Sequence, residues 1–159
     1  MDIEYRKLVP YESKMYRKIR LESLQQFPDS FETNYEEALN TEKLRMEIDI
    51  ENQNPKKFVW GAFIAQKLIA LCAFVIDDNN VGNIYQMYVK KDFQGENIGS
   101  GLIQSVIQEA KEKFNITEVF LEVAVKNHPA YYLYKKNGFE EADCERNETS
   151  EVIVMKYTL

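Results

Sequence analysis

The segment Gln94-Gly95-Glu96-Asn97-Ile98-Gly99-Ser100-Gly101 decides the fold of this chain. It follows a β-like run, residues 83–89, and leads into a predicted helix. Apolar residues recur every four positions along that helix, at Ile98, Leu102, Val106, Ala110 and Phe114. Glycines in a strand–turn–helix unit let backbone N–H groups converge at the positive end of the helix dipole. The segment therefore predicts an anion site, suited to a phosphate group of a nucleotide-like cofactor.

Two common phosphate-binding motifs do not fit this segment. A P-loop requires Lys followed by Ser or Thr directly after its last glycine, whereas the residue after Gly99 is Ser100 and the next lysine is Lys111. A Rossmann fingerprint placed on Gly99 and Gly101 would have its third glycine at Gln104, and it belongs to a first βαβ unit. Taken alone, the segment is equally well explained as a turn that only joins a strand to a helix.

The residues around this turn resemble the pyrophosphate-binding motif of the GNAT superfamily of acetyl-CoA-dependent N-acetyltransferases. That motif has Gln or Arg, two residues, Gly, one residue, and then Gly or Ala. The chain departs from it at Asn97, where the family usually has its first glycine, although Asn tolerates a left-handed backbone. The resemblance implies acetyl-CoA as co-substrate and the following contacts to it: Gln94, Gly95, Glu96, Asn97, Ile98, Gly99 and Ser100.

A second segment resembles the C-terminal motif of the same superfamily. It begins with Glu122-Val123-Ala124-Val125-Lys126-Asn127 and continues with Leu133-Tyr134 and Asn137-Gly138-Phe139. The resemblance implies that Asn127 and Tyr134 contact the thiol arm of CoA. The N-terminal half of the chain matches the superfamily only in its order of elements.

Composition indicates one globular domain, residues 1–159, because 45% of the residues are hydrophobic and 29% are charged. No apolar run approaches the ~20 residues of a membrane span. The first residues lack a signal-peptide pattern, so we expect a cytoplasmic protein without a membrane partner. The cysteines, Cys72 and Cys144, lack metal-site spacing, and we expect neither a bound metal nor a disulfide framework.

The net charge of −6 indicates which classes of partner the protein favours. It argues against nucleic acid and mildly favours a cationic substrate such as an amine. The turn itself must then attract an anionic cofactor. Lys90 and Lys91 precede it and are candidates for helping, the alternative being solvated surface lysines. The resemblance also allows a homodimer, since many relatives pair through exposed strands.

The remaining pattern predicts a mixed sheet with the α/β (α+β) layout of a single GNAT domain: about seven strands flanked by about four helices. Strands are expected at residues 3–9, 58–65, 68–76, 81–89, 119–125, 140–145 and 152–157. Helices are expected at residues 11–26, 33–52 with a break near Asn40-Thr41, 98–114 and 129–137. A turn at Gln66-Lys67 predicts a hairpin. By resemblance, the strands ending at Val89 and near Val125 run parallel and splay apart to admit the pantetheine arm.

Acetyl transfer from a thioester to an amine requires a base for the amine, donors for the oxyanion and a proton for the thiolate. Backbone N–H groups of Met87, Tyr88 and Val89 are the natural oxyanion donors. Tyr134 lies seven residues after Asn127, close to two helical turns, so both can face one side. By resemblance, Tyr134 is the candidate for protonating the thiolate, the alternative being a core tyrosine on an amphipathic helix.

The general base is less well defined by the sequence. Glu122 occupies a strand position from which some family members draw a base, either as a partly buried carboxylate or as an ordinary surface residue. Glu36 and Glu37 are further candidates, since the N-terminal helices usually wall the acceptor site. His128, the single histidine, is expected to face solvent rather than act as the base.

These residues predict an N-acetyltransferase that moves an acetyl group from acetyl-CoA directly to a primary amine in a ternary complex. The acceptor is either a small-molecule amine or a protein amine. Neither cysteine lies in a motif, which disfavours a thiol acyl-enzyme. The alternative from another class is a non-catalytic acyl-CoA-binding or regulatory module with the same fold.

Overall fold

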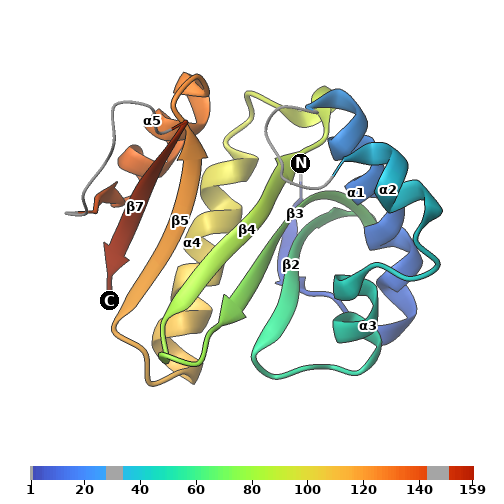
Figure 1. Ribbon diagram of the computed structural model, residues 1–159, viewed down its shortest axis with the longest axis horizontal. Helices are drawn as coiled ribbons and strands as arrows, with labels where there is room; N and C mark the ends of the chain where they lie inside the picture. The colour runs from blue at the N-terminus through green and yellow to red at the C-terminus, as the bar shows by residue number, and fades with distance from the viewer. Residues whose placement is uncertain (1, 28–33, 143–150) are drawn as a thin grey trace.

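A mixed sheet of seven strands runs through the centre of the molecule (Figure 1). The computed structural model describes residues 2–27, 34–142 and 151–159. The strands are β1 Glu4–Lys7, β2 Lys57–Ile64, β3 Lys67–Ile76, β4 Gly82–Val89, β5 Glu118–Ala124, β6 Glu140–Glu141 and β7 Val152–Thr158. Their order across the sheet is β1-β2-β3-β4-β5-β7-β6, and only β4 and β5 pair in parallel.

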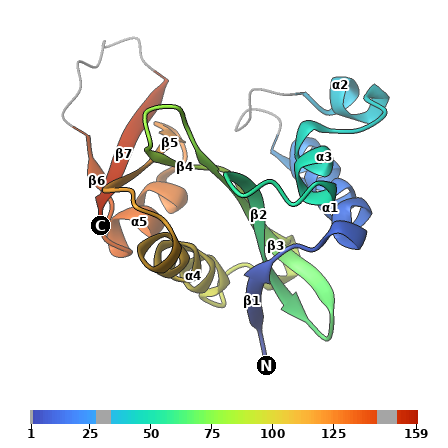
Figure 2. The ribbon, with the colours of Figure 1, turned by 90° about the horizontal axis from the view of Figure 1, so that it is seen from below.

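The helices cover both faces of this sheet (Figure 2). They are α1 Ser13–Gln26, α2 Tyr35–Asn40, α3 Arg45–Glu51, α4 Ile98–Lys113 and α5 His128–Lys136, with short 3-10 turns η1 Pro10–Glu12 and η3 Lys91–Phe93. The helices α1, α2 and α3 lie on one face, and α4 and α5 lie on the other. The described chain thus has five α-helices, where the sequence pattern predicted about four.

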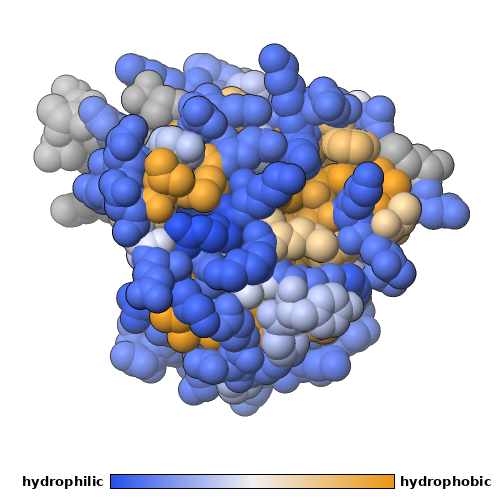
Figure 3. Space-filling view, turned by 90° about the vertical axis from the view of Figure 1, so that its right-hand side faces the viewer, coloured by the Kyte–Doolittle hydropathy of each residue, from blue (hydrophilic) through white to orange (hydrophobic). Residues whose placement is uncertain are grey.

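Covering both faces explains why β2 and β3 are apolar along almost their whole length. Because successive side chains point to opposite faces, the strands divide their residues between two cores. Phe58, Cys72 and Phe74 pack against α4, where the predicted apolar stripe of the helix is buried. Val59 and Leu71 pack against α1 and α3. The surface over α1–α3 is largely hydrophilic with separate apolar patches (Figure 3).

The predicted hairpin between β2 and β3 is confirmed, with its turn one residue earlier than expected. Ala65 and Gln66 form the turn, and both have positive φ, 48° and 67°. Two consecutive residues with positive φ are typical of a type I′ turn, whose twist matches the flanking strands. The sequence pattern missed the position because neither residue belongs to the usual Asn-Gly type.

The predicted break within residues 33–52 is also confirmed, but its capping is different. Asn40 and Thr41 do not begin the second helix; α3 starts after Leu44, whose backbone N–H donates to Glu47 Oε1 at 2.9 Å. A side chain three residues into the helix therefore satisfies the backbone group at its start. The expected strand at residues 140–145 is seen as β6, and residues 143–145 lie outside the described part of the chain.

The parallel pairing of β4 and β5 is confirmed and very short. Only Gly82 with Val119 and Asn83 with Phe120 are partners. Beyond Asn83 the two strands diverge, as Figure 1 shows. The strands therefore splay at the place where the sequence predicts the pantetheine arm to enter.

Candidate active site

The glycine-rich segment connects the end of β4 to the start of α4. Gly95 and Asn97 both adopt left-handed backbone conformations, with φ of 85° and 63°. Gln94 Nε2 donates a 2.9 Å hydrogen bond to the Val89 carbonyl oxygen, which ties the turn back to the strand. Asn97 is the N-cap residue of α4, and its side chain makes no capping hydrogen bond. Asn97 thus adopts the left-handed backbone conformation that the sequence analysis expected this residue to tolerate.

The start of α4 presents backbone donors suited to an anion. In any α-helix the first N–H groups have no acceptor within the helix, and here these belong to Ile98, Gly99 and Ser100. A Cβ at Gly95 would meet no atom within 4 Å, so the turn is open on that side. The helix is 16 residues long, which gives its N-terminus the full positive dipole. These donors and this opening fit a pyrophosphate group.

Two other glycines of the segment, Gly99 and Gly101, allow close packing between elements instead of opening the turn. A Cβ at Gly99 would lie 3.1 Å from Leu133 Cδ2, which shows that Gly99 allows α5 to approach α4. A Cβ at Gly101 would overlap the hydroxyl of Tyr5, so Gly101 permits packing against β1. Ser100 is also engaged, because its Oγ accepts a 3.0 Å hydrogen bond from Asn137 Nδ2. The sequence placed Asn137 in the C-terminal motif and at a helix end, but it gave no signal for this link to α4.

Beyond Asn83, a gap separates the diverging strands β4 and β5. The backbone of β4 turns two of its three predicted donors toward this gap. Lys90 N donates to the Ile69 carbonyl of β3 at 2.9 Å, and Tyr88 pairs with Leu71 of the same strand. Because N–H groups alternate in direction along a strand, Tyr88 faces β3, whereas Met87 and Val89 face the side where β5 diverges. The geometry therefore favours Met87 and Val89 over Tyr88 as donors to an oxyanion or to the pantetheine amides.

The side chain of Tyr88 points to the other face of the sheet. The Tyr88 hydroxyl donates a 2.8 Å hydrogen bond to Glu22 Oε2. This bond connects β4 to α1. Burial raises the pKa of Tyr88, and the carboxylate of Glu22 raises it further. Its side chain therefore stabilises the fold. Lys90 also contacts Glu22, at 3.8 Å, whereas Lys91 is an exposed residue of η3.

Tyr134 lies in the core between α5 and the sheet, with its ring 6.0 Å from that of Phe139 in an edge-to-face arrangement. Only 6% of the residue is exposed. Burial raises the pKa of Tyr134 well above its ordinary value, and the neighbouring Cys72 raises it further. The hydroxyl therefore keeps its proton at neutral pH, as a proton donor must. Asn127 starts the same helix, and its Oδ1 accepts from the Ala130 N–H at 3.2 Å.

The carboxylates predicted as bases are all on the surface. Glu122 is exposed on β5, so of the two alternatives that the sequence left open, the surface residue is the one that the structure shows. The reason is alternation: Leu121 and Val123 point into the α4 core, and Glu122 points to the opposite face, which α1–α3 do not cover at this strand. Glu36 and Glu37 are exposed in the first turn of α2. His128 is exposed, as expected.

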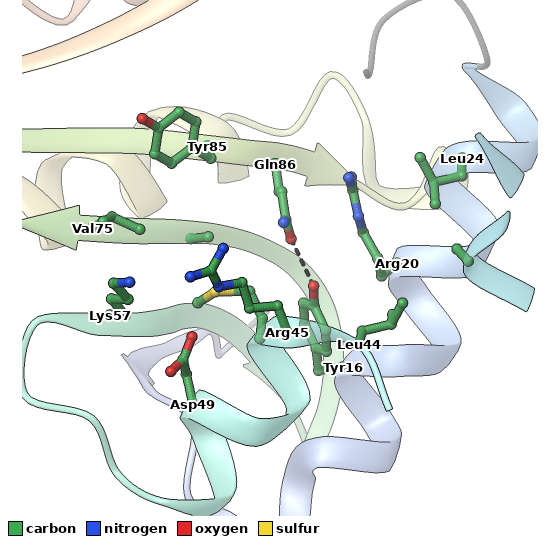
Figure 4. A pocket seen from close by; sticks show the side chains of 13 residues that line it. Tyr16, Arg20, Leu24, Leu44, Arg45, Asp49, Lys57, Val75, Tyr85 and Gln86 are labelled. Atoms are coloured by element: carbon green, nitrogen blue, oxygen red, sulfur yellow. Dashed lines mark hydrogen bonds between the residues drawn. The ribbon is translucent and has the colours of Figure 1, made fainter. Parts of the chain in front are cut away.

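A cavity of about 330 Å³ lies between α1–α3 and the sheet, next to the gap (Figure 4). A β-bulge shapes its wall, because β4 has one residue more than β3 between the pairs Tyr85–Ala73 and Tyr88–Leu71. Gln86, with φ of 58°, stands at the bulge and accepts a 2.7 Å hydrogen bond from the Tyr16 hydroxyl. Both Tyr85 and Gln86 therefore line the same cavity.

Sequence patterns did not identify this cavity. Its charged lining residues are Arg20, Arg45, Asp49 and Lys57, which come from α1, α3 and β2 and form no motif.

Among the residues that the structure describes, no group of three or more His, Cys, Asp or Glu side chains could hold a metal ion. In the same part of the chain no helix is long and apolar enough to cross a membrane.

The chain is similar in sequence to known acetyltransferases. The model of the Acetyltransferase (GNAT) family matches residues 21–139. An N-alpha-acetyltransferase from Sulfurisphaera tokodaii is 39% identical over 66 residues, which is 42% of this chain and 40% of that protein. A ribosomal protein bS18-alanine N-acetyltransferase from Escherichia coli strain K12 is 35% identical over 78 residues, 49% of this chain and 50% of that protein. The chain thus spans half or less of the length of these curated relatives.

The fold is also similar to that of solved structures. The PaiA N-acetyltransferase from Thermoplasma acidophilum, crystallised in complex with coenzyme A, has a TM-score of 0.78 to this chain. The match covers 100% of both chains at 24% sequence identity. At this identity the likeness shows that the two proteins share the fold.

Proposed function

This chain belongs to the GNAT acetyltransferase family, and we propose that it transfers an acetyl group from acetyl-CoA to a primary amine. The observation that carries the proposal is the coincidence of two features at one end of the sheet. β4 and β5 separate after two residue pairs, and the N–H groups at the start of α4 open beside that separation. A phosphate-bearing donor with a long amide-containing arm fits such a turn and gap.

The turn residues would hold the pyrophosphate of acetyl-CoA through backbone N–H groups rather than through a cluster of cationic side chains. Gly95 and Asn97 shape the turn, and Gly99 and Ser100 contribute N–H groups at the helix start. Gln94 keeps the turn against β4 through its bond to Val89. In the gap, the Met87 and Val89 N–H groups would pair with the amides of the pantetheine arm or with the thioester oxygen.

Transfer then follows by direct attack. The amine nitrogen forms a bond to the acetyl carbonyl carbon, the carbon–sulfur bond breaks, and CoA leaves as a thiolate. Glu122, exposed on β5, accepts the amine proton through water, and Tyr134 donates a proton to the thiolate. A route through Cys72 is disfavoured, because burial raises the pKa of Cys72 to about 12 and keeps the thiol protonated.

The acceptor includes protein α-amines within this proposal, because the two matched relatives are named for acetylating such amines. We also propose that the protein is cytoplasmic, because the Escherichia coli relative is named for a ribosomal protein. A small-molecule amine and a homodimer stay predictions.

Calorimetric titration of acetyl-CoA, followed by measurement of CoA release with a panel of primary amines, tests the proposal. The informative variant is Gly95→Val, because a β-branched residue is strained at φ of 85° and the position touches no core atom within 4 Å. Gln66→Val is the matched control, with a positive φ of 67° in the remote hairpin turn. We expect the wild type and the control to bind acetyl-CoA and to release CoA with an amine, and Gly95→Val to lose binding. A wild type that does not bind acetyl-CoA would refute the proposal.

A further inference from the structure

The cavity beside the gap has a charge opposite to that of the chain. Its lining residues include three cations, Arg20, Arg45 and Lys57, and one carboxylate, Asp49. The chain as a whole carries a net charge of −6. Overall charge predicted a cationic substrate, whereas a concave site lined mostly by cations concentrates anions. The charge of the cavity therefore differs in sign from the charge of the whole chain.

The cationic groups of this cavity are placed for a ligand. Within the described parts of the chain, neither Arg45 nor Lys57 forms a salt bridge with an acidic side chain. Figure 4 shows Arg45 and Lys57 on one side of the cavity and Arg20 on the other. Arg20 is only 6% exposed, and burial lowers its pKa, so an anion beside it would stabilise its charge.

Gln86 adds a neutral donor between these cations. Its Oε1 accepts from the Tyr16 hydroxyl at 2.7 Å, which orients the amide and leaves the Nε2 group as a donor at the cavity wall. The polar groups that line the cavity are therefore mainly donors: two guanidinium groups, one ammonium group and one amide. A carboxylate, which only accepts hydrogen bonds when ionised, is their chemical complement.

The cavity also lies next to the gap in which the proposed reaction takes place. Tyr85 and Gln86 follow Asn83, the last residue of β4 that pairs with β5, and they precede Met87, whose N–H faces the gap. A molecule whose amine reaches the gap would thus place its remaining atoms against the cations. The volume of about 330 Å³ suits a small molecule or the first residues of a peptide.

We propose that the acceptor is a primary amine with a carboxylate a few bonds away, and that Arg45, Lys57 and Arg20 bind this carboxylate while Gln86 donates to it. The inference rests on the proposed acetyl transfer and names the class of its acceptor. The same cations assist the reaction, because positive charges close to an ammonium group favour its neutral, nucleophilic form. The carboxylate belongs either to a small amino acid or to an acidic residue near a peptide N-terminus.

Matched acceptors that differ only in this carboxylate test the proposal and distinguish the two sources. The small-molecule pair is 4-aminobutyrate and 4-aminobutanamide. The peptide set is alanyl-glutamate, alanyl-glutamine and alanyl-lysine, each amidated at its C-terminus so that the side chain is the only difference in charge. We expect kcat/KM to be about tenfold or more higher for the acidic member of at least one set, as a charge-assisted hydrogen bond supplies.

Two variants connect this preference to the cavity. Lys57→Gln and Arg45→Gln each remove one lining cation, and we expect each to reduce the preference for the acidic acceptor about tenfold while acetyl-CoA affinity is unchanged. Lys56→Gln is the control, because Lys56 is the exposed neighbour of Lys57 and does not line the cavity. It should retain the wild-type preference.

The outcomes separate this inference from the function on which it rests. Acetylation of the neutral or basic acceptors at rates equal to the acidic ones would refute the carboxylate-bearing acceptor and leave the acetyltransferase proposal intact. A preference that survives in both Lys57→Gln and Arg45→Gln would refute the role of the cavity. Acetyl-CoA binding without acetylation of any acceptor would overturn both proposals.

Discussion

Asn137 Nδ2, just after α5, donates a 3.0 Å hydrogen bond to Ser100 Oγ in the first turn of α4. The same amide nitrogen donates to the Leu133 carbonyl at 2.8 Å, and Asn137 Oδ1 accepts from Gln104 Nε2 at 3.1 Å. One side chain thus joins the end of α5 to the turn of α4 that carries the proposed phosphate donors. This contact connects the two motifs, which are separate in the sequence.

Replacing Asn137 with Ala should therefore weaken acetyl-CoA binding. The Ser100 hydroxyl and the first turn of α4 lose their connection to α5, and we expect Kd to rise roughly 3-fold to 10-fold, as the loss of one partly buried hydrogen bond implies. Calorimetric titration of acetyl-CoA into the wild type and the variant measures this change in Kd. Asn115→Ala, beyond the opposite end of α4, is the control and should bind as the wild type does. Unchanged binding in Asn137→Ala would show that the contact does not support the site.

Asn97 provides a test of the turn itself. Its φ of 63° is accessible to Gly and Asn but strained for other residues, so Asn97→Ala should lower the free energy of unfolding by about 1 kcal/mol. Asn97→Gly should keep the turn and bind acetyl-CoA at least as tightly as the wild type. Urea denaturation and titration measure the two effects. If Asn97→Gly binds acetyl-CoA more weakly than the wild type, the Asn side chain itself contacts the donor.

A substitution at Tyr134 tests catalysis separately from acetyl-CoA binding. Tyr134→Phe keeps the edge-to-face packing against Phe139 and removes only the hydroxyl, so acetyl-CoA affinity should be unchanged. Loss of the proton donor should lower kcat about 100-fold or more, the usual contribution of a general acid. Tyr132→Phe is the control, because Tyr132 is 64% exposed on the same helix. Equal kcat in the two variants would exclude the hydroxyl from the reaction.

Glu47 links stability to pH. It is fully buried and bonded to Arg17 at 2.7 Å. Burial alone would raise the pKa of Glu47, but the Leu44 N–H and the Arg17 guanidinium hold it below the ordinary value of 4.5. Because the folded pKa is the lower one, this stabilisation is complete above the unfolded value near 4.5 and is lost as pH falls through the folded value.

Glu47→Gln should therefore lower the free energy of unfolding at pH 7 by about 1–3 kcal/mol, because a buried charge-assisted bond becomes a weaker one. The difference from the wild type should shrink as the pH falls below 4.5. Urea denaturation at a series of pH values measures this difference. Glu36→Gln, on an exposed carboxylate of α2, should show no such dependence. A constant difference across the series would mean that the charge of Glu47 does not contribute.

The sequence predicted the elements that depend on local pattern. The stripe from Ile98 to Ala110 determines α4, because residues four apart share a face of a helix. The apolar runs of β2 and β3 are strands buried on both sides, and Asn97 tolerates the left-handed turn that opens α4. The turn that carries the proposed phosphate donors was thus predictable, since all of its residues are consecutive.

Features that depend on packing between distant segments were not predictable. The direction of the β4 N–H groups and the bulge at Gln86 follow from pairing with β3, and the exposure of Glu122 follows from which face of β5 the helices leave uncovered. The cavity brings together residues from α1, α3 and β2, and its cations have the opposite sign to the net charge.

The sequence alone therefore determined the family, the order of elements and the turn for the proposed donor, because periodicity and glycine placement act over a few residues. Only the tertiary structure decided the sign and shape of the cavity for the proposed acceptor and the contact between Asn137 and Ser100. These depend on which side chains meet after the chain has packed, and no local pattern carries that information.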